Sequence, residues 1–235
     1  MPQPESASNF LSATAVLEKE LERVFCSHPG KKREESFYRD LEAVLKQFLP
    51  PLYAAYDGYL EGVLLAEGKK IHCRPGCSAC CSHYVSSVEP FEILAIHSRI
   101  KESERYPDLL FACHDRAMRF EALRHAEGED EEADDRALYR YFLRGSTCPF
   151  LGRGGECGIY ESRPMSCRMF FSESPPRFCA GKEIASPWNK NFQVELPVEA
   201  EEALARCSRR LAELEIPESL FEGLLEANQL FGKYG

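Results

Sequence analysis

The chain has 235 residues, of which 29 are basic and 38 acidic, and its formal net charge at pH 7 is −9. A chain of this length can bury one sizeable hydrophobic core, so we expect a single domain over residues 1–235. The sequence has no block of basic residues, and its negative charge would repel nucleic acid phosphates and acidic lipids. These properties argue against a nucleic acid or a membrane as the partner.

Residues 1–20 lack a basic segment followed by an unbroken apolar run, which is the pattern of a secretory signal. No window approaches the roughly eighteen consecutive apolar residues that a membrane-spanning helix needs. We therefore expect a cytoplasmic protein.

Two helices are predicted before the first cysteines of the irregular region, the first of them over about residues 9–25. In the second, residues 37–65, apolar side chains recur at helical spacing and form a stripe on one face. Pro50 and Pro51 fall in the middle of this pattern, where each removes a backbone hydrogen bond and its ring clashes with the preceding turn. We expect them to kink this helix or to split it in two.

Further helical patterns follow. Residues 86–102 carry Ser87 as a candidate N-cap and Pro90 in the first turn. Apolar periodicity also marks residues 108–126, 135–143, 198–214 and 217–231. The predicted fold class is mainly α, with irregular cysteine-rich metal-binding segments packed among the helices.

Between residues 145 and 197 the helical periodicity breaks down, and the sequence is dense in Gly, Pro, Ser and Cys. A segment without a continuous apolar face needs an internal staple, which a bound metal would supply. The stretch GRGGECG within it is bounded by cysteines and not by a strand and a helix. We therefore expect a turn there and not a phosphate-binding loop.

Eleven cysteines is a high and odd number for a chain with no export signal. In a reducing compartment such density is typical of metal binding or catalytic thiol chemistry more than of disulfides. Eight of them lie in the two irregular segments: Cys73, Cys77, Cys80, Cys81, Cys148, Cys157, Cys167 and Cys179. Of the other three, we expect Cys113 and Cys207 to be small buried hydrophobes and Cys26 to lie at a helix end.

The eight cysteines are the candidate metal ligands, and we expect the helices between the two segments to bring them together. In the loop CSAC, two thiolates can bind one ion while backbone N–H groups donate to the sulfurs. Cys80 and Cys81 differ from this pattern, because adjacent side chains diverge and can serve one cluster only in an unusual backbone. Eight cysteines provide either two four-thiolate sites or one site with spare thiols, and the sequence leaves both open.

Thiolate sites carry negative charge, so cationic residues are expected nearby. The candidates are Arg74, Arg163 and Arg168, with ordinary surface positions as the alternative. His72 and His83 flank the first cysteine segment and could replace a thiolate as a ligand.

The spacing of Cys73, Cys77 and Cys80 also matches that of radical S-adenosylmethionine enzymes, in which three cysteines hold an iron–sulfur cluster. Those enzymes carry an aromatic residue before the last cysteine, where this chain has Ala79. They also place the loop in a βα barrel, which this sequence does not predict. We keep this reading as a minor alternative that favours iron.

Taken together, CRPGCSACC, CPFLGRGGECGIYESRPMSCRMF and the later FC at Cys179 resemble the YkgJ-type cysteine-cluster family, also called the CxxCxxCC or zinc- or iron-chelating domain family. One departure is the first gap, where three residues separate Cys73 from Cys77 and the family name implies two. The resemblance implies a cysteine-cluster metal-binding region over residues 71–180, flanked by N-terminal and C-terminal helices. It also implies that the eight cysteines chelate zinc or iron.

Three functions are compatible with these cysteines. The first is an iron–sulfur protein that acts in electron transfer, sensing or cofactor-assisted modification. The second is a structural zinc module whose helices form a scaffold for a protein partner, which the sequence does not identify. The third is metal-free thiol chemistry at Cys80 with Cys77 or Cys81, although eight cysteines exceed what it needs. The sequence has no hydrolase motif, so we assign no enzymatic activity.

Overall fold

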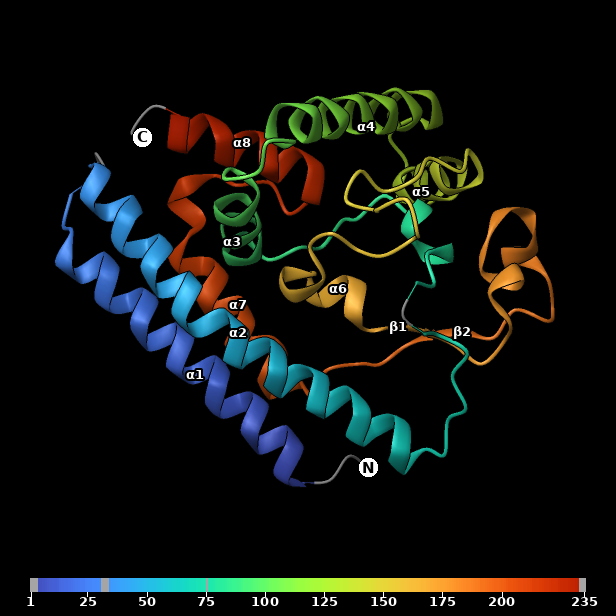
Figure 1. Ribbon diagram of the computed structural model, residues 1–235, viewed down its shortest axis with the longest axis horizontal. Coiled ribbons are helices and arrows are strands. Elements are labelled where there is room, and N and C mark those ends of the chain that lie inside the picture. Colours follow the sequence, from blue (N-terminus) through green and yellow to red (C-terminus); the bar gives the residue numbers. More distant parts are fainter. Residues whose placement is uncertain (1–3, 31–33, 75, 233–235) are drawn as a thin grey trace.

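The structure is a computed structural model that describes residues 4–30, 34–74 and 76–232. Within these ranges the regular elements are eight α-helices, short 3-10 turns and one two-stranded antiparallel sheet. The fold is mainly α, as predicted, and the cysteine-rich segments lie among the helices (Figure 1).

The helices are α1 (Pro4–Ser27), α2 (Glu35–Ala66), α3 (Pro90–Ile100), α4 (Tyr106–Glu127), α5 (Ala133–Leu143), α6 (Met165–Arg168), α7 (Val198–Arg210) and α8 (Leu220–Gly232). The strands are β1 (Phe170–Ser172) and β2 (Asn191–Gln193). The 3-10 turns are η1 (Ala79–Ser82), η2 (Tyr160–Ser162), η3 (Pro176–Cys179), η4 (Gly181–Ala185) and η5 (Ala212–Leu214). Each predicted helix is present, with bounds that differ by a few residues.

Helices α1 and α2 lie side by side and antiparallel along one edge of the molecule (Figure 1). Their apolar stripes face each other, and the ring of Phe10 on α1 lies against Tyr56 on α2 with centroids 5.2 Å apart. Helix α7 packs on α1, where the Arg206 guanidinium donates to both carboxylate oxygens of Glu18 at 3.0 Å. The stripe predicted for the second helix is therefore a core face.

Helix α2 runs unbroken through Pro50 and Pro51, so the predicted split is wrong. Both prolines lie on the exposed face of the helix. The carbonyl groups that lose their partners belong to Lys46 and Gln47, which are also exposed and can bind water instead. Packing of the opposite, apolar face holds the helix together despite the two missing hydrogen bonds.

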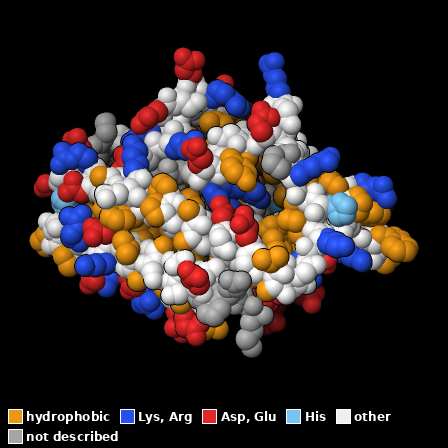
Figure 2. All heavy atoms as spheres, turned by 60° about the horizontal axis from the view of Figure 1, so that its bottom comes forward, with side chains coloured by type: hydrophobic (Ala, Val, Ile, Leu, Met, Phe, Trp, Pro, Cys, Tyr) orange, Lys and Arg blue, Asp and Glu red, His pale blue; other side chains and the backbone are white. Residues whose placement is uncertain are grey.

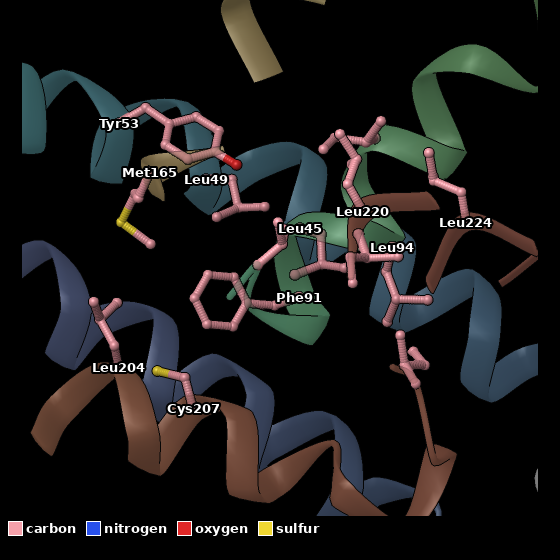
Figure 3. Close-up of a cluster of buried hydrophobic side chains, with 14 of the residues drawn as sticks. Leu45, Leu49, Tyr53, Phe91, Leu94, Met165, Leu204, Cys207, Leu220 and Leu224 are labelled. Atoms are coloured by element: carbon pink, nitrogen blue, oxygen red, sulfur yellow. The ribbon is translucent and has the colours of Figure 1, made fainter. Parts of the chain in front are cut away.

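The core is built around α3, where side chains from α2, α3, α7 and α8 meet (Figure 3). Phe91 is fully buried at its centre, and Leu45 and Leu220 are also shielded from solvent. Met165 of α6 belongs to the same cluster. Burying such a side chain stabilises a fold by roughly 1.5–3 kcal/mol, so the core anchors the short helix that carries Cys167.

The start of α3 differs from the prediction. Pro90 is its first residue, as expected, but the N-cap is Glu89 and not Ser87. The side chain of Glu92 accepts a hydrogen bond from the Glu89 N–H at 3.3 Å, which satisfies a donor at the helix start. Ser87 lies two residues earlier in a left-handed conformation, with φ of 58°.

The two strands pair in register, with Phe171 opposite Phe192 and their ring centroids 5.9 Å apart. Residues 173–190, between the strands, form an excursion that carries η3 and η4 and projects from one end of the molecule (Figure 1). Cys179 lies in this excursion.

Acidic and basic side chains are interspersed over the face seen in Figure 2. Among the described helices, none combines the length and apolar character that a bilayer span requires.

Candidate metal centre

The two cysteine segments lie against each other, as the sequence analysis expects. The backbone N–H of Cys148 donates to the carbonyl oxygen of Cys81 at 2.9 Å. The N–H of His72 donates to the carbonyl of Ser172 at 2.8 Å. The first segment is therefore tied at one end to β1 and at the other to the start of the second segment.

Cys80 and Cys81 share the tight turn η1. The backbone N–H of Cys81 donates to the carbonyl oxygen of Ser78 at 3.0 Å, and the N–H of His83 donates to the carbonyl oxygen of Cys80 at 3.1 Å. In this backbone the side chains of the two cysteines hydrogen-bond to each other, which raises the pKa of Cys80. The turn therefore brings the two adjacent side chains into contact with each other.

The second segment begins as a compact hairpin. The N–H of Gly152 donates to the carbonyl oxygen of Glu156 at 2.8 Å, and the N–H of Gly158 donates to the carbonyl oxygen of Phe150 at 2.7 Å. Leu151 forms a single antiparallel bridge with Cys157. The stretch GRGGECG is a turn within this hairpin, as predicted.

Close contact between the two loops depends on glycine. Gly155 has φ of +83°, and a Cβ built on it would lie 3.0 Å from the carbonyl oxygen of Gly76 and 3.4 Å from Ser78 Oγ. Any larger side chain would force the loops apart, and the positive φ disfavours one in any case. The cysteine loops therefore approach each other through this position.

Helix α6 presents Cys167 to the same region. The N–H of Cys167 donates to the carbonyl of Pro164 at 2.9 Å, and the Arg163 guanidinium donates to the carbonyl of Cys167. Arg163 is therefore beside the cysteines, as predicted. Arg74 is exposed, which is the surface alternative.

Arg168, which directly follows Cys167, is buried and is not a surface residue. Its guanidinium is buried, donates to the carbonyl groups of Tyr160, Glu161 and Arg163 at 2.7–3.0 Å, and pairs with Asp57 at 2.7 Å. It fastens the loop before α6 to helix α2, so its role is structural.

Cys80 has neighbouring thiols in both segments. Burial is the main cause of the raised pKa of Cys73, Cys148 and Cys167, and the nearby Cys80 makes a smaller contribution to each. Together with its bond to Cys81, this places Cys80 within electrostatic reach of both segments.

The other three candidates join the same group. Charge on Cys77 and on Cys179 adds to the effect of burial on the pKa of Cys73. Charge on Cys157 acts in the same way at Cys148. Cys179 is buried on η3, which packs against η1, and its thiol donates to Asn191 Oδ1 at 3.2 Å. Each of the eight predicted cysteines therefore lies near at least one other of the group, and their role as ligands stays a prediction.

Burial raises the pKa of Cys148 to about 11 and that of Cys167 to about 12, against the opposing charge of Arg163 at Cys167. Buried thiols of this kind become thiolates at neutral pH when a metal cation displaces their protons. A nucleophilic or redox-active thiol requires a lowered pKa instead. The pKa of Cys80, the thiol common to both pairs of the metal-free reading, is raised by its bond to Cys81 and by burial, which argues against that reading.

As the side chains lie, no three His, Cys, Asp or Glu residues in the described ranges converge closely enough to hold one ion. The donor set nevertheless fits zinc or iron in its chemistry, because all eight candidates are free thiols that are buried or half-buried. Backbone N–H groups of Ser172 and Phe150 favour the thiolate forms of Cys73 and Cys148.

The three remaining cysteines lie where the sequence places them. Cys113 and Cys207 are fully buried on α4 and α7, and Cys26 is exposed near the end of α1. Cys113 is closer to the centre than its sequence suggests, because charge on Cys148 adds to the effect of burial on its pKa. No pattern in the sequence signals this proximity.

The two histidines differ. His72 is exposed. The ring of His83 stacks on Phe142 with centroids 4.1 Å apart, and its Nε2 is buried with no hydrogen-bond partner among the described residues. Burial lowers the pKa of His83, which favours the neutral ring that a metal ligand requires. His83 therefore fits the ligand role better than His72.

Glu92 is a buried carboxyl that the sequence reading missed. Its Oε1 accepts the N–H of Met165 at 2.9 Å, and this bond ties the first residue of α6 to α3. Burial raises the pKa of Glu92 to about 7 in spite of that hydrogen bond. An acidic residue on an apolar helix face was the only available signal.

A family model described as "Putative zinc- or iron-chelating domain" (CxxCxxCC) matches residues 72–191. The match covers just over half of the chain and all eight candidate cysteines, so the chain belongs to this cysteine-cluster family and is a metal-binding protein. Searches of curated proteins and of solved structures gave no match.

Proposed function

We propose that the chain is an iron–sulfur protein with one centre shared by the two cysteine segments, its ligands drawn from the eight candidate cysteines. The carrying observation is the direct contact between the two segments: the Cys148 N–H donates to the Cys81 carbonyl oxygen at 2.9 Å, and a Cβ on Gly155 would lie 3.0 Å from the Gly76 carbonyl oxygen. Two separate centres, one for each segment, would not require this arrangement.

The chain's own residues would set the properties of such a centre. An iron–sulfur cluster supplies one-electron redox chemistry when bound. Arg163 adds positive charge beside Cys167, and the N–H groups of Ser172 and Phe150 favour the thiolates of Cys73 and Cys148. Burial of the thiols limits the access of water to the bound metal. We place the protein in a reducing compartment, the cytoplasm, in electron transfer, sensing or cofactor-assisted modification.

The alternative is a structural zinc module that serves as a scaffold for a protein partner. It is favoured by the make-up of the second segment, which contributes only a few buried apolar side chains, among them Phe150, Ile159 and Met165. A zinc ion held by four thiolates would stabilise such a segment outright.

The test is an absorption spectrum with iron, zinc and acid-labile sulfide analysis on protein purified without oxygen. Brown protein with a band near about 400 nm, and with iron and sulfide in similar amounts, is the expected result. Colourless protein with stoichiometric zinc and no sulfide would replace the proposal by the zinc module.

A further inference from the structure

The excursion between β1 and β2 encloses a shallow hollow of about 430 Å³, lined by Glu173, Ser174, Pro175, Arg177, Phe178, Trp188 and Lys190. Its volume lies within the range of small-molecule sites, which is roughly 300–1,000 Å³. The hollow lies outside the group of eight cysteines, although Cys179 directly follows Phe178 in the chain.

The backbone around the hollow is held by hydrogen bonds. Ser174 is buried, its Oγ lies 2.8 Å from Ser172 Oγ, and it accepts the N–H of Lys190 at 3.0 Å. Next to Trp188 in the chain, the side-chain amide of Asn189 donates to the carbonyl oxygen of Ile184 at 2.8 Å. The two ends of the excursion are thus fixed relative to each other, and the lining residues are held in place.

The lining of the hollow carries more positive than negative charge, although the protein as a whole has a net charge of −9. Arg177 and Lys190 are exposed and form no ion pair with any residue that the structure describes. Glu173 is the one acidic residue of the lining, and its carboxylate forms an ion pair with the ammonium group of Lys69 at 3.4 Å. Two unpaired cations therefore face an open space in a chain with a net charge of −9, and an anion would be attracted there.

The aromatic residues give the hollow a second property. Trp188 is 70% exposed, although exposing an indole ring to water is unfavourable. Phe178 lies under the guanidinium of Arg177 at 4.7 Å from its centroid. The hollow thus combines one exposed aromatic ring, that of Trp188, with two cationic groups that form no ion pair among the described residues.

From this juxtaposition we propose that the hollow binds a small planar ring that carries an anionic group, a ligand of the nucleotide kind. The ring stacks on Trp188, and Arg177 and Lys190 pair with the anionic group. The inference does not depend on the metal, because none of the contacts involves a cysteine.

The test uses the fluorescence of Trp188, the sole tryptophan in the chain, during titration of the full-length protein with AMP. We expect saturable quenching with a Kd of about 1 mM or below. Adenosine and inorganic phosphate, which each lack half of the recognised chemistry, are expected to bind at least about tenfold more weakly.

Arg177→Ala is expected to weaken AMP binding at least about tenfold. Lys182→Ala is the matched control, because Lys182 is an exposed cation on the same excursion that does not line the hollow. The absence of saturable quenching by AMP, or equal weakening by the two variants, would overturn the proposal. Adenosine or phosphate binding as tightly as AMP would do the same. Since zinc or iron content is measured separately, failure here leaves the metal proposal intact.

Discussion

Cys148 donates its backbone N–H to the carbonyl oxygen of Cys81 at 2.9 Å, and this bond joins two segments that are far apart in the sequence. Both partners are backbone groups, so replacing either side chain leaves the bond available. The backbone contact that aligns the two segments therefore does not depend on the cysteine sulfur atoms. Cysteine variants can be used to test ligation without removing this contact.

Cys167→Ser is expected to lose bound metal and to destabilise the fold, since the site loses a ligand and bound metal contributes to folding free energy. The same holds for Cys77→Ser in the first segment. Cys207→Ser is the best control, because Cys207 lies on α7 among apolar side chains. Cys113→Ser is also expected to keep its metal. Metal content per chain and urea denaturation are the measurements, and equal metal loss in all four variants would contradict this assignment.

Gly155→Ala is expected to reduce metal content, because the added Cβ would press on Gly76 and separate the cysteine loops. Gly145→Ala is the matched control: Gly145 also has a positive φ, +66°, but open space surrounds its Cβ position. Both variants should lose about 1–2 kcal/mol of stability through backbone strain. Only Gly155→Ala should bind less metal, and equal metal content in the two proteins would count against the loop contact.

Arg168→Leu is expected to destabilise the protein by about 3 kcal/mol, because three backbone carbonyl groups and Asp57 lose a charged donor. Arg168→Lys should recover little of this, since an ammonium group cannot reproduce the planar set of donors. The exposed pair of Arg99 and Glu161 serves as the comparison, and Arg99→Leu should cost no more than about 0.5 kcal/mol. Urea denaturation distinguishes these outcomes.

The raised pKa of Glu92 predicts that the free energy of unfolding falls as the pH rises towards neutral. Its pKa is about 7 in the folded protein and near 4.5 when unfolded, so between these values the folded state binds more protons. The contribution of Glu92 to stability is therefore fully present below about pH 4.5 and is lost as the pH rises through about 7. Glu92→Gln should remove this dependence because an amide does not titrate, and it should lose some stability at every pH because its Nε2 cannot accept the N–H of Glu89 or Met165. Parallel stability–pH curves for the two proteins would refute the assignment.

The sequence predicts the helices well because their apolar periodicity reports the buried faces directly. It fails at Pro50 and Pro51, where the outcome depends on which face of α2 they occupy in the assembled fold. It also misplaces the cap of α3 at Ser87, because an acidic side chain at Glu92 competes for the same backbone donor. The first error is a local preference that tertiary packing overrides, and the second is one local capping pattern displacing another.

For the candidate site, the eight cysteines stand out in the sequence by their density and by their place in segments without periodicity, and their role as ligands stays a prediction. The partners of Arg168 and the burial of Glu92 could not be identified from the sequence, because each depends on contacts between elements far apart in the chain. The same reasoning missed the hollow of Trp188, since its lining meets only when the ends of the excursion are brought together by the β1–β2 pair.

The most direct test of the central claim is the metal content of Cys77→Ser and Cys157→Ser, one variant from each segment, purified without oxygen beside Cys207→Ser. If one centre is shared by the two segments, each of the first two variants loses nearly all of its metal while Cys207→Ser keeps the wild-type amount. Retention of half the metal in both Cys77→Ser and Cys157→Ser would mean two independent sites and would contradict the shared centre.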